Sequence, residues 1–116
     1  MMLQFHAVVY IMQFAFAGTN LSSIILPDNV FMISEKAFED TNLTTIILPA
    51  SIGEIHESAF YCTNLTSVTF ESNTISIGQH LAEAFYGDLR VKYQSGGAGT
   101  YTTTAPVDSS SVWTKQ

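Results

Sequence analysis

The sequence predicts a solenoid of stacked, mainly parallel β coils, in about three to four coils that follow a 22-residue period. Two observations support this prediction. An Ala-Phe pair recurs with its phenylalanine at Phe16, Phe38, Phe60 and Phe85, so that the first two intervals are equal and the third is slightly longer. A Thr-Asn-Leu triplet follows the first three pairs, at residues 19–21, 41–43 and 63–65. A fixed period of 20 to 50 residues is typical of stacked repeat folds.

Each triplet opens a segment with the residue types of a β-strand. In the middle copy, LTTIIL, the apolar Ile46 and Leu48 stand two residues apart and point inward, whereas Thr45 and Ile47 point outward. β-Branched Thr and Ile favour strands. Proline directly follows the first two segments, and a residue without a backbone N–H ends a strand there. We therefore expect strands at 21–26, 43–48 and 65–70.

Between these strands, short extended or helical segments return the chain to the start of the next coil. A Val-x-x-Ile pattern at Val30 and Ile33 reappears as Ile52 and Ile55, and turns two more apolar residues toward the core. No window is long and amphipathic enough for a long helix. The chain therefore divides into a degenerate N-terminal partial coil at 1–14, a solenoid at 15–93 and a tail at 94–116.

The N-terminal segment 1–17 is mostly apolar. Gln4, His6 and Gln13 interrupt the run, and no basic residue precedes it, so it makes no convincing signal peptide. Counting back from Phe16 places Val8 and Ile11 at the positions of Val30 and Ile33. The segment thus reads as the second half of a decayed coil.

The C-terminal tail, 94–116, is rich in Gly, Ser and Thr. The flexible stretch SGGAG precedes two short β-prone runs, TYTTT and SSVWTK, on either side of APVDS. This arrangement favours a β-hairpin that caps the solenoid. A disordered tail is the alternative.

Composition excludes several function classes. The net charge is −6 and only four residues are basic, which leaves no basic footprint for nucleic acid and disfavours an anionic membrane surface. We expect no membrane insertion, because no uninterrupted apolar run is long enough. The single cysteine, Cys62, allows neither an intramolecular disulfide nor a cysteine metal cluster.

No pattern predicts catalysis, and we assign no catalytic residue, no metal site and no cofactor. His6, His56 and His80 stand in different coils with no second ligand at metal spacing, and no G-x-S-x-G nucleophile elbow occurs. Glycosylation sequons begin at Asn20, Asn42 and Asn64, and the repeat explains them as a structural asparagine column. An enzyme on this scaffold is the least favoured hypothesis.

The three predicted strands contain no charged residue, whereas the acidic residues fall in turns and return segments. Their outward positions would make a flat, uncharged surface for a protein partner. An ordinary exposed sheet is the competing interpretation. The candidate binding residues are Ser23, Ile25, Thr45, Ile47, Ser67 and Thr69.

The pattern Leu-x-x-Ile-x-Leu-Pro, followed by Val-x-x-Ile and Ala-Phe, resembles the BspA-like, spirochaete-type leucine-rich repeat over residues 15 to about 93. The resemblance implies a leucine-rich-repeat solenoid with one strand per repeat on one face. It also implies a bacterial surface or secreted protein of the adhesion type that binds host or microbial proteins without catalysis. The third copy departs from the pattern, since it lacks the proline and carries three extra residues around 79–82.

A structural role is the alternative to adhesion. The chain could be a fragment or a small paralogue of a longer repeat protein, and its apolar N-terminal segment carries no polar cap. Solenoid ends without such a cap expose apolar columns and strand edges. We therefore also consider a homodimer through Val8 and Ile11.

Overall fold

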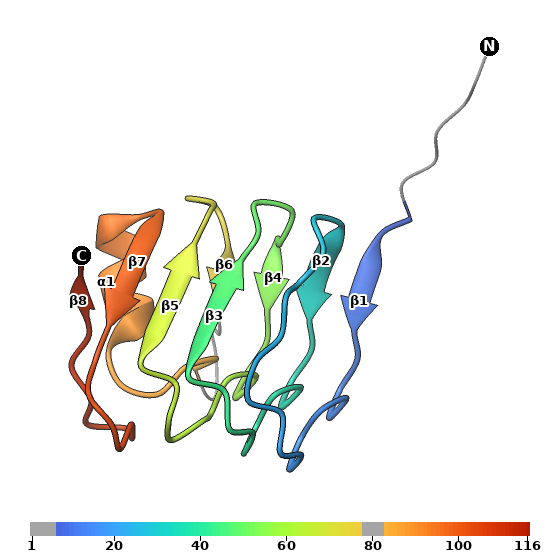
Figure 1. Cartoon of the computed structure of the whole chain (residues 1–116). Helices are drawn as coiled ribbons and strands as arrows, with labels where there is room; N and C mark the ends of the chain where they lie inside the picture. The colour runs from blue at the N-terminus through green and yellow to red at the C-terminus, as the bar shows by residue number, and fades with distance from the viewer. Residues whose placement is uncertain (1–6, 78–82) are drawn as a thin grey trace.

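The computed structural model describes residues 7–77 and 83–116, which form two β-sheets facing each other across a shared core (Figure 1). Sheet A contains four strands in the order β1-β2-β4-β6, and sheet B contains four in the order β3-β5-β7-β8. Among the described residues, one helix, α1 (Leu89–Gly96), lies in the C-terminal half. From β2 to β6 the chain alternates between the two sheets and so forms a repeat solenoid.

Sheet A is wholly parallel, and it comes from the return segments. Its strands are β1 (Val9–Ile11), β2 (Val30–Ile33), β4 (Glu54–Ile55) and β6 (Ser76–Ile77). Each coil thus contributes a second short strand where extended or helical pieces were expected. The apolar spacing explains this, because in each later strand the terminal isoleucine reaches the core: Ile33, Ile55 and Ile77 are at most 3% exposed.

The register of β1 differs from the one that counting residues predicts. Val9, not Val8, stands opposite Val30, and an irregularity after Val9 brings Ile11 level with Ile33. The first coil is therefore one residue shorter than the next in this segment. Val8 lies outside the strand with 61% of its surface exposed.

Sheet B corrects the expectation of a mainly parallel sheet, because it is mixed. Strands β3 (Thr45–Leu48) and β5 (Ser67–Phe70) are parallel, as expected. β7 (Gly99–Thr102) then pairs antiparallel with β5, and β8 (Thr114–Lys115) antiparallel with β7. An antiparallel hairpin, hereafter the C-terminal hairpin, thus takes the place of a further parallel strand.

The strand expected at 21–26 does not form. One backbone hydrogen bond, from Asn42 N to Leu21 O at 2.9 Å, ties this segment to the next coil, and no strand ladder continues from it. Ile25 is 95% exposed, whereas its equivalent Ile47 is 57% exposed. The segment is outermost in its layer, so no ladder on its other side holds it against the stack.

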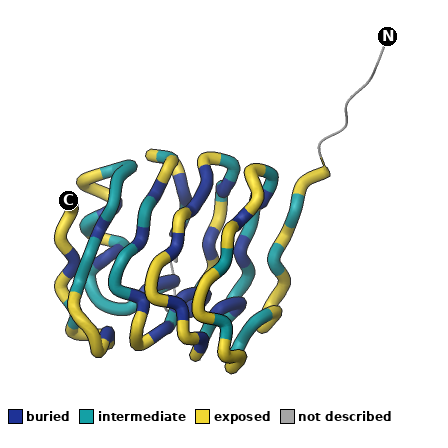
Figure 2. Tube along the Cα trace, in the orientation of Figure 1, coloured by how far each residue is buried: buried dark blue, intermediate teal, exposed yellow. Residues whose placement is uncertain are grey.

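The core is built from columns of equivalent residues. The rings of Phe16, Phe38, Phe60 and Phe85 stack in sequence, with centroids 5.2, 5.1 and 5.0 Å apart and planes within 9° of parallel. This offset stacking is a favourable aromatic geometry. Figure 2 shows the buried positions as a line running through successive coils. Ala37 and Ala59, which precede two of these rings, are fully buried.

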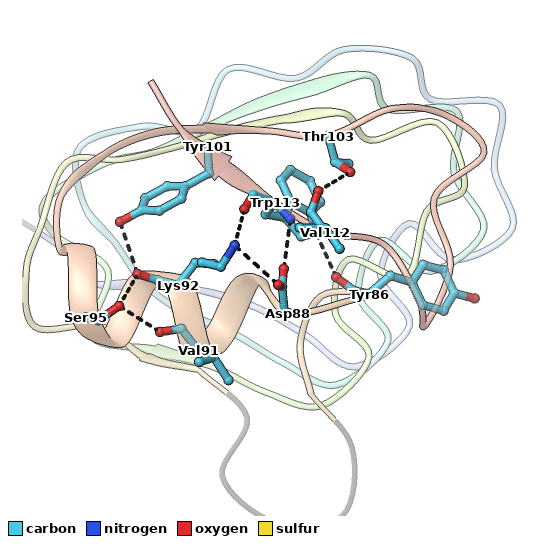
Figure 3. A network of polar contacts seen from close by, with 9 residues as sticks. All are labelled: Tyr86, Asp88, Val91, Lys92, Ser95, Tyr101, Thr103, Val112 and Trp113. Atoms are coloured by element: carbon cyan, nitrogen blue, oxygen red, sulfur yellow. Dashed lines mark hydrogen bonds and ion pairs between the residues drawn. The ribbon is translucent and has the colours of Figure 1, made fainter.

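The C-terminal end of the stack is closed by α1 and the C-terminal hairpin. Tyr93 of α1 and Tyr101 of β7 both pack on Phe70, and Trp113 is 1% exposed. Asp88 accepts a hydrogen bond from Trp113 N at 2.8 Å, and the indole Nε1 donates to Tyr86 O at 2.9 Å (Figure 3). Lys92 Nζ donates to Trp113 O at 2.6 Å. These contacts fix the hairpin against the last coil.

Candidate binding face

The predicted outward positions of β3 do face solvent. Along β3, Thr45 and Ile47 are exposed, whereas Ile46 and Leu48 are 2% and 0% exposed. This alternation follows from the two-residue period of a strand. In Figure 2, buried and exposed stretches follow one another along the strands of the stack.

Ser67 and Thr69 of β5 also point outward, but they are half-buried. Their neighbours Val68 and Phe70 fill the core at 0% and 1% exposure. The antiparallel β7 beside them accounts for the partial cover. Thr69 Oγ1 lies 2.8 Å from Thr100 Oγ1, a hydrogen-bonding distance between two outward hydroxyls.

The outward surface continues onto residues that sequence reasoning did not select. Ser67 stands opposite Thr102, Thr69 opposite Thr100, and Thr102 opposite Thr114. Directly opposed residues of an antiparallel pair share one side of the sheet. Tyr101 lies opposite Val68 on the inner side, and both are buried, which agrees with this assignment.

We define the contact face as the outward side of β3, β5, β7 and β8. Neighbouring strands stand about 4.8 Å apart, so its hydroxyls form rows across the sheet. The alternating threonines of TYTTT were a usable signal for the additional positions, but nothing in the sequence said which strand they would join. The contact face consists of Thr45, Ile47, Ser67, Thr69, Thr100, Thr102 and Thr114.

Ser23 and Ile25, the other two predicted binding residues, lie in the segment that does not form a strand. Both are exposed. Four of the six predicted residues are therefore brought together on one sheet, and these two are not part of it.

The contact face carries no charged side chain. Lys115 stands opposite the inward Tyr101 and donates from Nζ to Gly96 O, so it points toward α1. Gln116 Nε2 donates to Thr102 Oγ1 at 2.6 Å, so an uncharged amide borders this edge. The contact face can offer hydroxyl hydrogen bonds and the aliphatic surface of Ile47.

The turns, in contrast, carry acidic groups that lie close together. A side-chain hydrogen bond with Glu35 raises the pKa of Glu57, and burial and the charge of Glu35 raise it further. Lys36 and His56 oppose this effect through their charges. Gln13 Nε2 donates to Glu35 Oε1, so residues one coil apart form a polar ladder.

Reactive thiols and metal ligands are the groups to consider for catalysis among the described residues. Cys62 is 1% exposed, burial raises the pKa of its thiol, and its Sγ donates to Phe38 O at 3.0 Å. Within 7–77 and 83–116, no group of three His, Cys, Asp or Glu side chains is placed to hold a metal ion. His6, His80 and the extra residues at 79–82 lie outside the described residues. Nor does any helix in the described ranges have the length and hydropathy needed to cross a membrane.

Comparison with known families decides the relationship. The sequence matches the BspA type leucine rich repeat region over residues 3–93, in six copies. The chain belongs to the BspA-type leucine-rich repeat family. No curated protein and no solved structure matches it.

This BspA-type repeat match ends within α1, so β7 and β8 lie beyond it. The contact face is therefore composite. Two of its strands, β3 and β5, belong to family repeats, and the other two belong to the C-terminal hairpin. Leucine-rich repeat domains commonly mediate protein interactions and are generally non-catalytic.

Proposed function

We propose that this BspA-type repeat protein is a non-catalytic protein-binding module and that its contact face is the binding site. The observation that carries the proposal is an uncharged surface, continuous across four strands, on a chain whose net charge is −6. The family match supports a protein as the partner.

The chemistry of the face defines the kind of partner. Hydroxyls of Thr45, Ser67 and Thr102 can donate and accept, while Ile47 supplies apolar area near one side. Without charge pairs at its centre, the interface gains little from long-range attraction. Its affinity should therefore depend only weakly on salt.

The family also bears on location. BspA-like repeat proteins are typically surface or secreted proteins. We propose the same location for this chain, with adhesion to host or microbial proteins as the activity.

A capture experiment tests the proposal. The wild-type chain, immobilised, is compared with a Thr45→Lys, Ile47→Lys double variant for capture of purified extracellular-matrix proteins. Both positions are exposed, so the variant keeps its fold. A Val91→Lys, Gln94→Lys variant adds the same charge on exposed positions of α1 and serves as control.

We expect the wild type and the α1 control to capture the same protein and the face variant to lose it. Equal capture by the face variant would show that another surface binds. Circular dichroism of all three chains confirms that the fold is retained.

A further inference from the structure

The Thr-Asn-Leu triplets place three exposed asparagines in one row. Asn20, Asn42 and Asn64 stand at equivalent positions of successive coils, and all three are exposed. Two of them lie in the turns that lead into β3 and β5, along the lower edge of the stack in Figure 1. The Asn42 N–H donates to Leu21 O at 2.9 Å, so the first two turns are also adjacent. We call these three residues the asparagine row.

The structural column that the repeat predicts for these asparagines does not form. Asparagine recurs in turns for two physical reasons: its side chain bonds the nearby backbone, and it tolerates a left-handed conformation. Within residues 7–77 and 83–116, none of the three side chains makes a hydrogen bond to another described residue. None of the three has a positive φ. Neither reason therefore accounts for asparagine in this row.

The residues on either side of each asparagine make the packing contacts instead. Thr41 is buried, and its Oγ1 donates to Phe38 O at 2.9 Å. Leu43 and Leu65 are 0% and 1% exposed. Because the side chain of Asn42 is exposed between two buried neighbours, a group attached to it would extend into solvent and leave these contacts intact.

The two other asparagines of the chain provide an internal contrast. Asn29 Nδ2 donates to Ala7 O at 2.8 Å, and Asn73 Oδ1 accepts from Ala98 N at 2.7 Å. Neither is followed by a serine or threonine two residues later. The asparagines with a structural contact thus differ from those of the asparagine row in their sequence context.

A hydroxyl residue follows each member of the asparagine row at the second position: Ser22, Thr44 and Thr66. Asn-x-Ser/Thr, with any residue but proline in the middle, is the acceptor pattern for an N-linked oligosaccharide. Ser22 and Thr44 are exposed, and Thr66 is half-buried. Among the described residues, none of these three hydroxyls is engaged in a hydrogen bond. The acceptor pattern is therefore complete and free in each coil.

We propose that Asn20, Asn42 and Asn64 are acceptor sites for N-linked glycosylation. The donor is an oligosaccharide joined to a lipid through pyrophosphate. The asparagine Nδ2 forms a bond to the anomeric carbon of the first sugar, and the bond from that carbon to the pyrophosphate oxygen breaks. The amide gives up one proton, and the lipid pyrophosphate leaves. This inference rests on the proposed surface or secreted location, since export brings a chain to the membrane that carries the donor.

Cell-free translation with microsomal membranes tests the proposal, because the microsomes supply both the lipid-linked donor and the transferase. The full 116-residue chain is placed behind a cleavable secretory signal peptide, whose removal confirms translocation. A glycosidase that converts each glycosylated asparagine to aspartate then lets peptide mass spectrometry locate the glycans. We expect glycans in the asparagine row and none on Asn29 or Asn73.

Matched variants at the middle coil test the role of the hydroxyl. In a chain with Asn20→Gln and Asn64→Gln, Asn42 is the remaining acceptor. Adding Thr44→Ala to this chain removes the hydroxyl but keeps the asparagine, whereas Thr44→Ser keeps both. We expect the first to lose the glycan and the second to retain it.

Unfolding of the unglycosylated protein separates an acceptor from a structural asparagine. Asn42→Ala should leave the urea midpoint unchanged, because its side chain bonds to no described residue. Thr41→Ala is the control and should lower the midpoint, since it removes a buried hydrogen bond to Phe38 O.

A translocated chain without glycan at any of the three positions would overturn the proposal. So would a fall in urea midpoint for Asn42→Ala as large as that for Thr41→Ala, because the asparagine would then have a structural role. The microsomes supply the compartment and no binding partner is present, so the outcome is independent of the capture experiment.

Discussion

At the scale of the residue, the turns of the stack repeat an uncommon backbone conformation. Phe14, Lys36 and Ser58, at equivalent positions of successive coils, have φ of 61°, 57° and 57°. Left-handed φ costs a non-glycine residue about 1–2 kcal/mol. The packing of successive coils imposes the conformation, because the same backbone path recurs whatever the side chain. Sequence reasoning missed this feature, since Phe, Lys and Ser carry no turn signature at these positions.

Substitutions at two glycines distinguish the cost of a left-handed backbone from the cost of a steric overlap. Gly18 (φ 71°) has open space where a Cβ would stand, so Gly18→Ala should cost about 1 kcal/mol from its backbone alone. At Gly87 (φ 74°) a Cβ would also overlap the Ser111 carbonyl. Gly87→Ala should therefore cost more, about 2 kcal/mol or above. Urea unfolding at one protein concentration measures the free energy of unfolding of each variant. Equal losses of stability in the two variants would show that the overlap with Ser111 adds no cost at Gly87.

The Glu35–Glu57 pair predicts a dependence of stability on pH. The pKa of Glu57 is raised in the folded protein, so the folded state holds this proton more tightly than the unfolded chain does. The stability that the pair contributes is then present at acid pH and is lost as the pH rises above the ordinary glutamate value of 4.5. Glu57→Gln keeps a hydrogen-bonding side chain but removes the charge.

We expect Glu57→Gln to be more stabilising, relative to wild type, at pH 7 than at pH 4. Urea midpoints of both proteins at the two pH values measure the difference. Glu71→Gln, which removes a carboxylate at another exposed position, is the control. A stabilisation by Glu57→Gln that is larger at pH 4 than at pH 7 would contradict the raised pKa of Glu57 in the folded protein.

At the scale of the element, the phenylalanine column links the coils. Phe38 is 0% exposed and stacks between Phe16 and Phe60, whereas Phe16 stacks on Phe38 and remains half-buried. Each good aromatic pair adds about 0.5–1.5 kcal/mol beyond the burial of its area. The column should therefore contribute less to stability at Phe16 than at Phe38.

Replacing a ring by leucine tests this gradient. Phe38→Leu should destabilise by about 2 kcal/mol, since two stacked pairs and buried area are lost. Phe16→Leu should cost less, about 1 kcal/mol or below, because one stacked pair is lost at a half-buried position. Both variants are measured by urea unfolding at one protein concentration. A larger loss at Phe16 would contradict the order of the column.

Sequence periodicity predicted some elements well and others poorly, for physical reasons. β3 and β5 follow from alternation in two segments of successive coils that pair directly with each other. The segment 21–26 has the same alternation, but it stands at the edge, where no ladder supports it on its outer side. The pairing of β7 with β5 depends on contacts between residues far apart in the chain, such as Thr69 with Thr100. The repeat period carries no information about such pairing.

At the scale of the whole molecule, the two ends of the described stack differ in burial, and the proposed binding site lies along its side. The C-terminal end is closed by buried Tyr93, Tyr101 and Trp113, whereas Val9, Ile11 and Phe16 in the first described coil are only partly buried. The contact face lies along the side of the stack, on sheet B.

The contact face extends onto the C-terminal hairpin, which lies beyond the family repeats. The most direct measurement is calorimetric titration of the captured protein against three chains: wild type, Thr45→Lys with Ile47→Lys, and Thr100→Lys with Thr102→Lys. We expect each variant to weaken binding at least about tenfold, which is about 1.4 kcal/mol, with little change in wild-type affinity as salt is raised. Unchanged affinity in both variants, or a steep loss of wild-type affinity with salt, would contradict binding through this uncharged face.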